Sequence, residues 1–274
     1  MRALLSLVAA VFCLSLTPGA AQAQTPSAWD QIMASKKIVA CVIPAYQPYS
    51  YKDQSGNWKG FSVDMVNDIA KDLHIEPEYR ESNLKTIVLD LQSNKCQVFI
   101  AFNATPERAL AIDFAGPIYT LGFLFVGRKG WHPPGNKWTD FNSPDIRVCY
   151  TVGNSAEQQL KRLAPKSTQI QLQESTDCIL ALISNRADAY LDGVMGALGA
   201  KQKSADLGDV IVPTPSFALP SYAGLRIDSD GRLDRFIQRW AEYNRANGNI
   251  TEWLLKNMEA VGISRAIIPP DIQF

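Results

Sequence analysis

This 274-residue sequence has few histidines, no net charge and no long apolar run after its first residues. Its 27 basic and 27 acidic residues cancel, so we expect no nucleic acid or other polyanion as a partner. Only His74 and His132 could supply imidazole ligands, and the cysteines lack the spacing of a zinc site. No Ser/His/Asp combination and no phosphate-binding glycine loop is visible, so the sequence predicts neither a bound metal nor a cofactor.

The first 23 residues have the pattern of a secretory signal peptide. Met1-Arg2 is positively charged, and the apolar run over 3–16 is too short to span a bilayer. Ala21-Gln22-Ala23 is a small-residue cleavage motif. Cys13 lies within the apolar run, which argues against a lipoprotein. We therefore expect cleavage near Ala23 and an exported, soluble chain.

The rest of the chain alternates strand and helix patterns. Apolar runs predict strands over 37–43, 75–79, 96–102, 146–152, 169–172 and 187–191. Helical spacing of apolar residues predicts helices over 62–73, 84–92, 177–184 and 233–247. Segment 113–117 reads as a turn and 127–143 as a loop. This alternation predicts an α/β fold with mostly parallel sheets.

An arginine follows one of the predicted strands in the stretch QVFIAFNATPERALAIDFAGPIY, residues 97–119. The strand ends at Phe102, and Asn103 and the turn Thr105-Pro106-Glu107-Arg108 follow. A fixed guanidinium at this place can hold a carboxylate, because it is planar, always charged and pairs through two hydrogen bonds. The alternative is that Arg108 only pairs with a neighbouring glutamate on the surface.

A glycine-containing turn follows a second strand, at Gly153-Asn154-Ser155-Ala156-Glu157. Asn154 or Ser155 can cap the helix that follows. A strand-to-helix turn of this kind presents free amides and the positive end of a helix, which favours an anion. The turn therefore predicts a second contact for a carboxylate.

Several segments together resemble the periplasmic solute-binding proteins of family 3, the receptors of polar amino acid ABC transporters. The resemblance covers nearly the whole mature chain. It rests on these motifs: Tyr46 with Pro48-Tyr49, Gly60-Phe61, Thr105 to Arg108, Asp113-Phe114, Pro117 to Tyr119, Arg186 to Gly193 and Asn247 to Ile250.

The resemblance implies a two-lobed α/β fold with two hinge strands that cross between the lobes. The implied division is a signal peptide at 1–23, lobe I at 24–117 and 223–274, hinge strands at 118–122 and 218–222, and lobe II at 123–217. The ligand is expected in the cleft, because open α/β sheets bind ligands beyond the carboxyl ends of their strands.

The resemblance also implies a set of ligand-binding residues. Arg108 would grip the ligand carboxylate, with Gly153, Asn154 and Ser155 as its second contact. Tyr46 would stack on one side of the ligand and Leu84 would cover the other. Phe102 and Asn103 would complete the wall on the lobe I side. A packing cluster of tyrosines is the alternative for the loop at 46–51.

The ligand amine is expected to meet an acid near Asp192. In the family this acid comes one residue later, at the position of Gly193. Neighbouring strand residues point to opposite faces, so Asp192 can serve only if the strand ends or bulges here. A ligand without an amine is the alternative. The position where the family often holds a side-chain-reading acid is Ile43, which argues against a cationic side chain.

Four cysteines remain after the leader, and four allow three pairings. We favour Cys41 with Cys96 and Cys149 with Cys178, because each pair then lies within one predicted lobe. Buried free thiols are the alternative.

The function expected from the resemblance is capture of a small carboxylate, above all an α-amino acid, in the periplasm. The expected partner is then an ABC transporter permease. We expect the protein to be a monomer and to have no enzymatic activity. The rival is an enzyme on the same scaffold, since some relatives are dehydratases of cyclic dienyl acids. A sensory receptor domain is a third reading, and the lack of an attached membrane or signalling segment argues against it.

Overall fold

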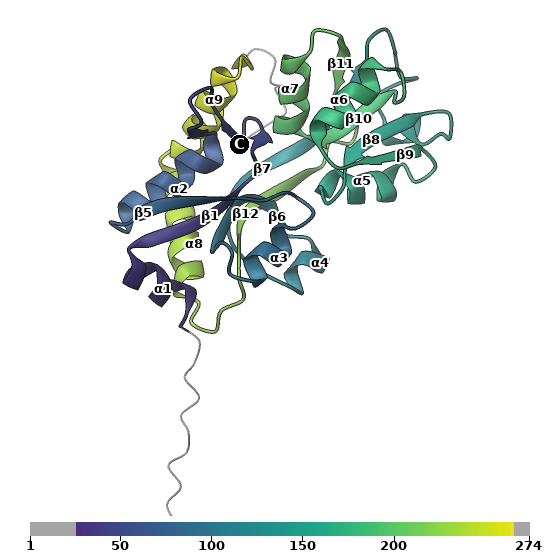
Figure 1. The fold of residues 1–274 in the computed structure, drawn as a ribbon. Coiled ribbons are helices and arrows are strands. Elements are labelled where there is room, and N and C mark those ends of the chain that lie inside the picture. The colour runs from purple at the N-terminus through teal and green to yellow at the C-terminus, as the bar shows by residue number, and fades with distance from the viewer. Residues whose placement is uncertain (1–25, 266–274) are drawn as a thin grey trace, which may run out of the picture.

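A computed structural model describes residues 26–265, so the predicted signal peptide lies outside the described residues. Two α/β lobes lie side by side and are joined by two long strands (Figure 1). The strands run in the order β5-β1-β6-β12-β7-β10-β8-β9, and β11 also pairs with β7. The predicted two-lobed α/β architecture is therefore confirmed.

The described part of lobe I contains three parallel strands, two crossover helices, the short helix that follows the third strand, an N-terminal helix and two C-terminal helices. The strands are β1 (Lys37–Val42), β5 (Glu76–Glu81) and β6 (Val98–Asn103), with β1 in the centre. The helices are α1 (Ala28–Ser35), α2 (Phe61–Asp72), α3 (Ile87–Gln92), α4 (Pro106–Ala109), α8 (Arg232–Ala246) and α9 (Asn249–Ala260). A small antiparallel sheet of β2 (Ala45–Tyr46), β3 (Ser50–Lys52) and β4 (Trp58–Lys59) follows β1.

Lobe II repeats the scheme with β10 and β9 on either side of β8. Its strands are β8 (Arg147–Thr151), β9 (Thr168–Leu172), β10 (Ala189–Gly193) and β11 (Leu207–Ile211). Its helices are α5 (Ser155–Leu163), α6 (Ser175–Ile183) and α7 (Val194–Lys203), and η1 (Trp138–Phe141) is a short 3-10 helix. The sequence did not predict α7, because its residues 194–200 are buried on all sides and lack an amphipathic period.

Two antiparallel strands, β7 (Asp113–Arg128) and β12 (Ala218–Leu225), connect the lobes. From Asp113 to Gly122 the long strand β7 pairs with β12, and from Phe123 onward it pairs with β10 in lobe II. In the described large sheet, every antiparallel pair involves β7 or β12. The residue bounds that we predicted for the two lobes and hinges stay a prediction.

The predicted turn at 113–117 is wrong, because these residues are the first part of β7. The Gly116-Pro117 pair, which read as a turn, lies where the register with β12 shifts between Ser221 and Ala223. Gly116 has a φ of 135°, which a residue with a side chain rarely adopts. A glycine and a proline within a strand mark an irregularity of pairing as well as a turn.

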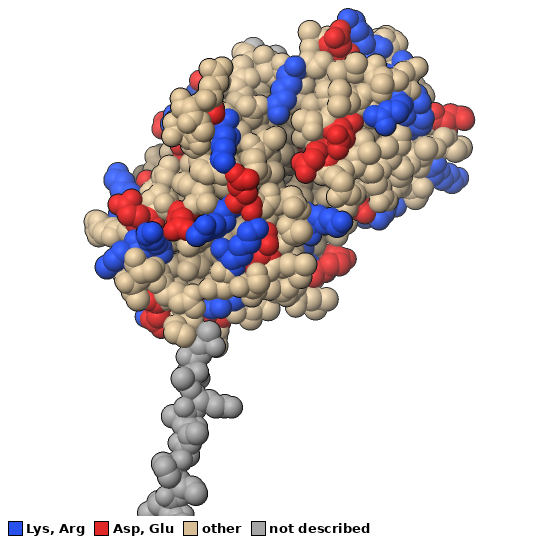
Figure 2. Space-filling model, viewed as in Figure 1, with Lys and Arg blue, Asp and Glu red and all other residues tan. Residues whose placement is uncertain are grey.

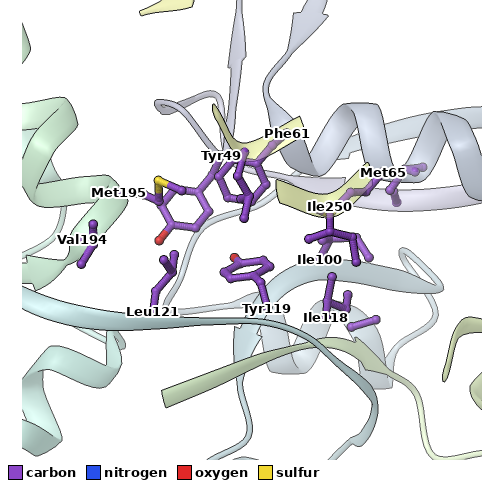
Figure 3. Packing of buried hydrophobic residues seen from close by; sticks show 14 of the residues in the cluster. Tyr49, Phe61, Met65, Ile100, Ile118, Tyr119, Leu121, Val194, Met195 and Ile250 are labelled. Carbon is purple, nitrogen blue, oxygen red and sulfur yellow. The ribbon is translucent and has the colours of Figure 1, made fainter. Parts of the chain in front are cut away.

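A continuous apolar cluster fills the junction of the two lobes. Tyr49 packs on Phe61 at 4.8 Å between ring centroids, and Phe61 meets the edge of Tyr119 on β7 at 5.6 Å. Figure 3 shows Met195 of α7 beside Tyr49, with Leu121 of β7 below them. The crossover strands therefore rest against side chains from both lobes.

Each lobe carries one disulfide, as predicted. Cys41 of β1 bonds to Cys96, with their Cα atoms 5.5 Å apart. Cys149 of β8 bonds to Cys178 of α6, with their Cα atoms 5.7 Å apart. Cross-links of this kind contribute about 2–4 kcal/mol each to stability. They tie strands β1 and β8, whose carboxyl ends lie at the cleft, to neighbouring segments.

The surface carries charges of both signs. Figure 2 shows lysine, arginine, aspartate and glutamate intermixed over the face in view, with most of the surface uncharged. Among residues 26–265, no helix is long and apolar enough to cross a membrane. In the same range, no group of three or more His, Cys, Asp and Glu residues is arranged to hold a metal ion.

Candidate functional site

A pocket lies between the lobes, at the carboxyl ends of β6, β8 and β10. Its walls come from both lobes and from the two connecting strands. It is lined by Tyr46, Tyr49, Leu84, Ala101, Phe102, Asn103, Arg108, Leu121, Gly122, Phe123, Asn154, Ser155, Asp192, Gly193 and Ser221. The structure thus brings together every ligand-binding residue predicted from the sequence except Gly153, which reaches the pocket wall through Arg108.

Arg108 is positioned by the short helix α4. The Thr105 side chain caps this helix by accepting from the Arg108 backbone amide at 3.4 Å, and Pro106 occupies the first helical position. The Arg108 guanidinium stacks on the Phe102 ring at 3.9 Å from its centroid. The Thr-x-x-Arg spacing therefore fixes the arginine at the third residue of the helix, over the end of β6.

The Arg108 guanidinium carries a charge without a charged partner. Its Nη1 donates to the Asn103 backbone carbonyl at 2.8 Å, and its Nη2 donates to the Gly153 carbonyl of lobe II. No described carboxylate forms a salt bridge with it. Burial lowers the pKa of Arg108 to about 10, so the group stays positive at neutral pH. The predicted alternative, a pairing of Arg108 with a surface glutamate, is not seen among the described residues.

Direct hydrogen bonds join the lobes around this arginine. Ser155 Oγ donates to Asn103 Oδ1 at 2.6 Å, and Gln158 Nε2 donates to Glu107 Oε2 at 2.9 Å. The Asn103 amide is held in turn by its Nδ2, which donates to the Pro220 carbonyl of β12 at 3.0 Å. The cleft is therefore closed at this side by polar contacts of α5 with the end of β6 and with α4.

Gly153 needs to be a glycine where the lobes approach. Its φ is 82°, and a Cβ built there would lie 2.8 Å from the Leu84 carbonyl oxygen across the cleft. Next to it, Asn154 caps α5 by accepting from the Ala156 amide at 3.1 Å. Of the two caps that the sequence allowed, Asn154 is the one observed. The positive end of α5 thus faces the pocket beside Arg108.

Asp192 is a fully buried carboxylate in the pocket wall. It accepts hydrogen bonds from the Tyr190 hydroxyl, from Asn154 Nδ2, and from the Gly193 amide at 2.8 Å. Burial raises the pKa of Asp192 to about 6, against the opposing effect of these three donors. The acid therefore lies in the pocket without any described cation beside it.

Asp192 lies in the pocket because it stands near the end of its strand, β10. Its register with β7 runs without interruption, with Asp192 opposite Leu124 and Gly193 opposite Phe123. β10 ends at Gly193 and α7 begins at Val194, so no bulge is present. A Cβ on Gly196 would collide with Asp192 Oδ2, so the first turn of α7 leaves room for the carboxylate.

Tyr46 and Leu84 both line the pocket from lobe I. The Tyr46 ring stacks on Tyr49 at 4.4 Å with an interplanar angle of 8°. Burial, and then the nearby Asp192, raise the pKa of Tyr46 well above its usual value, so its hydroxyl stays neutral. The tyrosines of this loop therefore pack on one another and also line the pocket.

Sequence reasoning missed the part of the wall that the connecting strands supply. Leu121, Gly122 and Phe123 of β7 and Ser221 of β12 all line the pocket. Leu121, Gly122 and Ser221 belong to the two segments predicted as hinge strands, and Phe123 directly follows the first of them, so their place between the lobes had a signal in the sequence. The sequence did not assign these residues to the ligand site, because only the pairing of β12 with β6 and β7 shows that Ser221 lies at the pocket.

The chain belongs to the bacterial extracellular solute-binding proteins, family 3, whose sequence model matches residues 38–243. It is 34% identical over 244 residues to a cyclohexadienyl dehydratase of Pseudomonas aeruginosa, covering 88% of this chain and 90% of that one. It is 26% identical over 215 residues to the arginine-binding extracellular protein ArtP of Bacillus subtilis, covering 77% and 80%.

Solved structures give the same fold. An ancestral amino acid-binding protein, described as a precursor of cyclohexadienyl dehydratase, has a TM-score of 0.75 at 25% identity, covering 84% of this chain and 99% of that one. The solute receptors for L-cysteine of Neisseria gonorrhoeae have a TM-score of 0.77 at 20% identity, covering 90% and 98%. The family therefore includes proteins named for binding and a relative named for catalysis.

Proposed function

We propose that this protein captures an α-amino acid in the cleft between its lobes and delivers it to the permease of an ABC importer. It acts as a monomer outside the cytoplasm, in the periplasm, after cleavage of its leader near Ala23. Family membership and the names of relatives such as ArtP support this function. The observation that carries it is the charged Arg108 guanidinium, which faces the pocket and has no carboxylate partner.

The ligand carboxylate takes the place that the Gly153 carbonyl now holds at Arg108. A carboxylate is the better acceptor, because hydrogen bonds between charged groups are about twice as strong as neutral ones. Ser155, as the first residue of α5, and the neighbouring amides supply the second contact. Ligand binding then bridges α4 and α5, which already contact each other in the closed structure.

The ligand ammonium binds at Asp192. A carboxylate offers about four acceptor positions, and three donors occupy three of them. One position remains for an ammonium hydrogen. Binding of a cation there also relieves the cost of keeping an ionised group buried and unpaired. Tyr46 and Leu84 cover the two sides of the ligand, while Phe102, Asn103 and Gly193 complete the walls around it.

A screen of the purified mature protein against the common amino acids and simple carboxylates tests this proposal. A ligand at about 100 times its dissociation constant adds about 2.7 kcal/mol to stability, which a thermal-shift assay detects. Hits are then measured by calorimetry. The expected result is tight binding of one or more α-amino acids, and failure of all of them to bind would contradict the proposal.

Dehydration of a cyclic dienyl acid is the second candidate. The named dehydratase relative and the buried Asp192, with its pKa of about 6, favour it, because a general acid works best with a pKa near the working pH. Arg108 would hold the side-chain carboxylate of the substrate, and Asp192 would protonate the ring hydroxyl, which leaves as water. The ring carboxylate would leave as CO2, and the electron pair of the broken C–C bond would complete the aromatic ring. Turnover of prephenate or arogenate, abolished in Asp192→Asn, would establish this activity. Absence of turnover, with amino-acid binding intact, would leave the transport function alone.

A further inference from the structure

A second pocket adjoins the first, and Arg108 does not line it. Ile43, Tyr46 and Leu84 of lobe I form one wall, and Thr151 and Glu174 of lobe II form part of the other. Tyr46 and Leu84 line both pockets, so the two pockets are compartments of one cleft and these side chains form the boundary between them. The first, proximal compartment contains Arg108 and Asp192, and the second, distal compartment contains Glu174.

Glu174 is the charged group of the distal compartment. It directly precedes α6, is exposed, and its side chain makes no hydrogen bond to the helix. Among residues 26–265, no lysine or arginine forms a salt bridge with it. Partial burial, and then the nearby Asp177, raise the pKa of Glu174, as expected of an acid that has no cation beside it. A carboxylate in this state gains from a positively charged partner.

Thr151 supplies a buried hydroxyl to the distal compartment. The residue is 4% exposed, and its side chain lies within reach of the Tyr190 hydroxyl, which itself donates to Asp192. No described group donates to Thr151 Oγ1, so its acceptor positions stay open to a donor of the ligand. Ile43 faces the same space and supplies only apolar surface.

We propose that the distal compartment receives a positively charged side chain, so that the preferred ligands are amino acids that carry a cation at the far end of an apolar stem. This inference rests on the proposed function. Arg108 binds the ligand carboxylate, and Tyr46 and Leu84 pack on the methylene groups of the ligand side chain. Glu174 forms an ion pair with the cation at the end of that side chain. The expectation drawn from Ile43 looked only at lobe I, whereas the acid here comes from lobe II.

Arginine and citrulline test the inference, because they have nearly the same shape and differ in the charge of the distal group. Wild-type protein should bind arginine at least about tenfold more tightly than citrulline, since hydrogen bonds to charged groups contribute more than neutral ones. In Glu174→Gln the affinity for arginine should fall about tenfold, while that for citrulline stays within about twofold. Calorimetry on both ligands gives these ratios.

Asp209→Asn is the matched control, because it removes one negative charge from lobe II at a side chain that is 79% exposed and lies outside both compartments. It should leave both affinities unchanged. Equal binding of arginine and citrulline by the wild type, or equal losses for both in Glu174→Gln, would overturn the inference. If instead no amino acid binds to the wild type at all, the proposed function fails as well, so the two failures are distinguishable.

Discussion

Two buried acids at opposite ends of β10 have opposite surroundings. Asp188, just before the strand, accepts from Arg128 Nε at 3.0 Å and from Arg147 Nη2 at 2.9 Å. Burial opposes its ionisation, but the hydrogen bonds from Arg147 and Arg128 hold the pKa of Asp188 at about 2. Asp192, at the end of the strand, has only uncharged donors, and burial raises its pKa to about 6.

The difference separates an acid that joins elements of the fold through ion pairs from one that we propose binds the ligand ammonium. Asp188 is satisfied by two arginines and joins β7, β8 and β10 at the outer end of lobe II. The ionised form of Asp192 costs about 3 kcal/mol at neutral pH, because burial holds the pKa of this carboxyl at about 6, above its ordinary value of 3.8. Natural sequences retain such a cost where an active or binding site requires it.

Arg108 is the basic counterpart of Asp192, and its removal should have the largest effect. Removing one partner of a buried charge pair costs about 3–5 kcal/mol, so Arg108→Ala should weaken amino-acid binding by at least about a hundredfold. The fold should persist, because the guanidinium is held only by two carbonyls and a ring. Calorimetry with the ligand found in the screen gives the ratio of affinities.

Arg239→Ala controls for the loss of a positive charge. This residue lies on α8 with its side chain 76% exposed and pairs with Glu242. Its replacement should not change ligand affinity. If Arg108→Ala binds the ligand about as tightly as the wild type, Arg108 does not bind the ligand carboxylate. Its hydrogen bonds to the Asn103 and Gly153 carbonyls would then serve only to join the lobes.

The next effect concerns the ammonium at Asp192. An amino acid should bind more tightly than its deaminated analogue by about 2–5 kcal/mol if the buried acid meets the ammonium. In Asp192→Asn this difference should largely vanish, because the charge is gone while the shape remains. The melting temperature should not fall by more than about 4 °C, since the variant no longer buries an unpaired charge.

Equal affinities for the amino acid and its deaminated analogue in the wild type would contradict the ammonium site. The protein would then be a receptor for carboxylates without an amine, with Gly193 standing where the family acid has been lost. Such a result would keep Arg108 as the carboxylate anchor and would restrict the ligand class.

Asp188→Asn should show the reverse behaviour, with a smaller energy. Breaking the pairs with Arg128 and Arg147 should destabilise the fold by about 2 kcal/mol, less than for a fully buried pair because those side chains are 28% and 35% exposed. Chemical denaturation measures this loss. Ligand affinity should stay within about twofold of the wild type, because Asp188 lies outside the pocket.

The pH dependence of stability provides a check on the same variant. The folded-state pKa of Asp188 lies below its ordinary value of 3.8, so its contribution is present above about pH 4 and is lost as the pH falls towards 2. Wild type and Asp188→Asn should therefore converge in stability in strong acid. A constant difference between them down to pH 2 would show that the ion pairs are not the source.

The sequence predicted the parts of the site that depend on neighbours along the chain. The Thr105 cap places Arg108 three residues later, and the Asn154 cap places the end of α5, so both could be read from local spacing. The disulfide Cys41–Cys96 followed from the division into lobes. The two caps need few residues and short separations, and tertiary packing did not override them.

The parts that the sequence did not predict depend on contacts between distant segments. Asn154 donates to Asp192 across 38 residues, and Gly196 leaves room for that carboxylate only because α7 turns back over β10. Ser221 enters the pocket through strand pairing, and Gly116 distorts a strand where it read as a turn. Neither the periodicity of apolar residues nor the composition of turns indicates which distant residues come into contact.

The smallest effect is the pH dependence of ligand binding, which separates the two acids without any mutation of the fold. The ionised form of Asp192 binds the ammonium, and its pKa before binding is about 6. The ionised fraction therefore falls about tenfold between pH 7 and pH 5, and the affinity for a neutral-side-chain amino acid should fall about tenfold with it. Asp188, with a pKa of about 2, stays ionised over this range and cannot contribute.

Asp192→Asn is the control, and its affinity should not change between pH 7 and pH 5. Calorimetry measures both proteins with a ligand whose side chain carries no charge, so that the charge of Glu174 does not affect the result. A wild-type affinity that is constant from pH 7 to pH 5 would mean that the ligand does not read the charge of Asp192. A profile that persists in Asp192→Asn would place the titrating group elsewhere in the cleft.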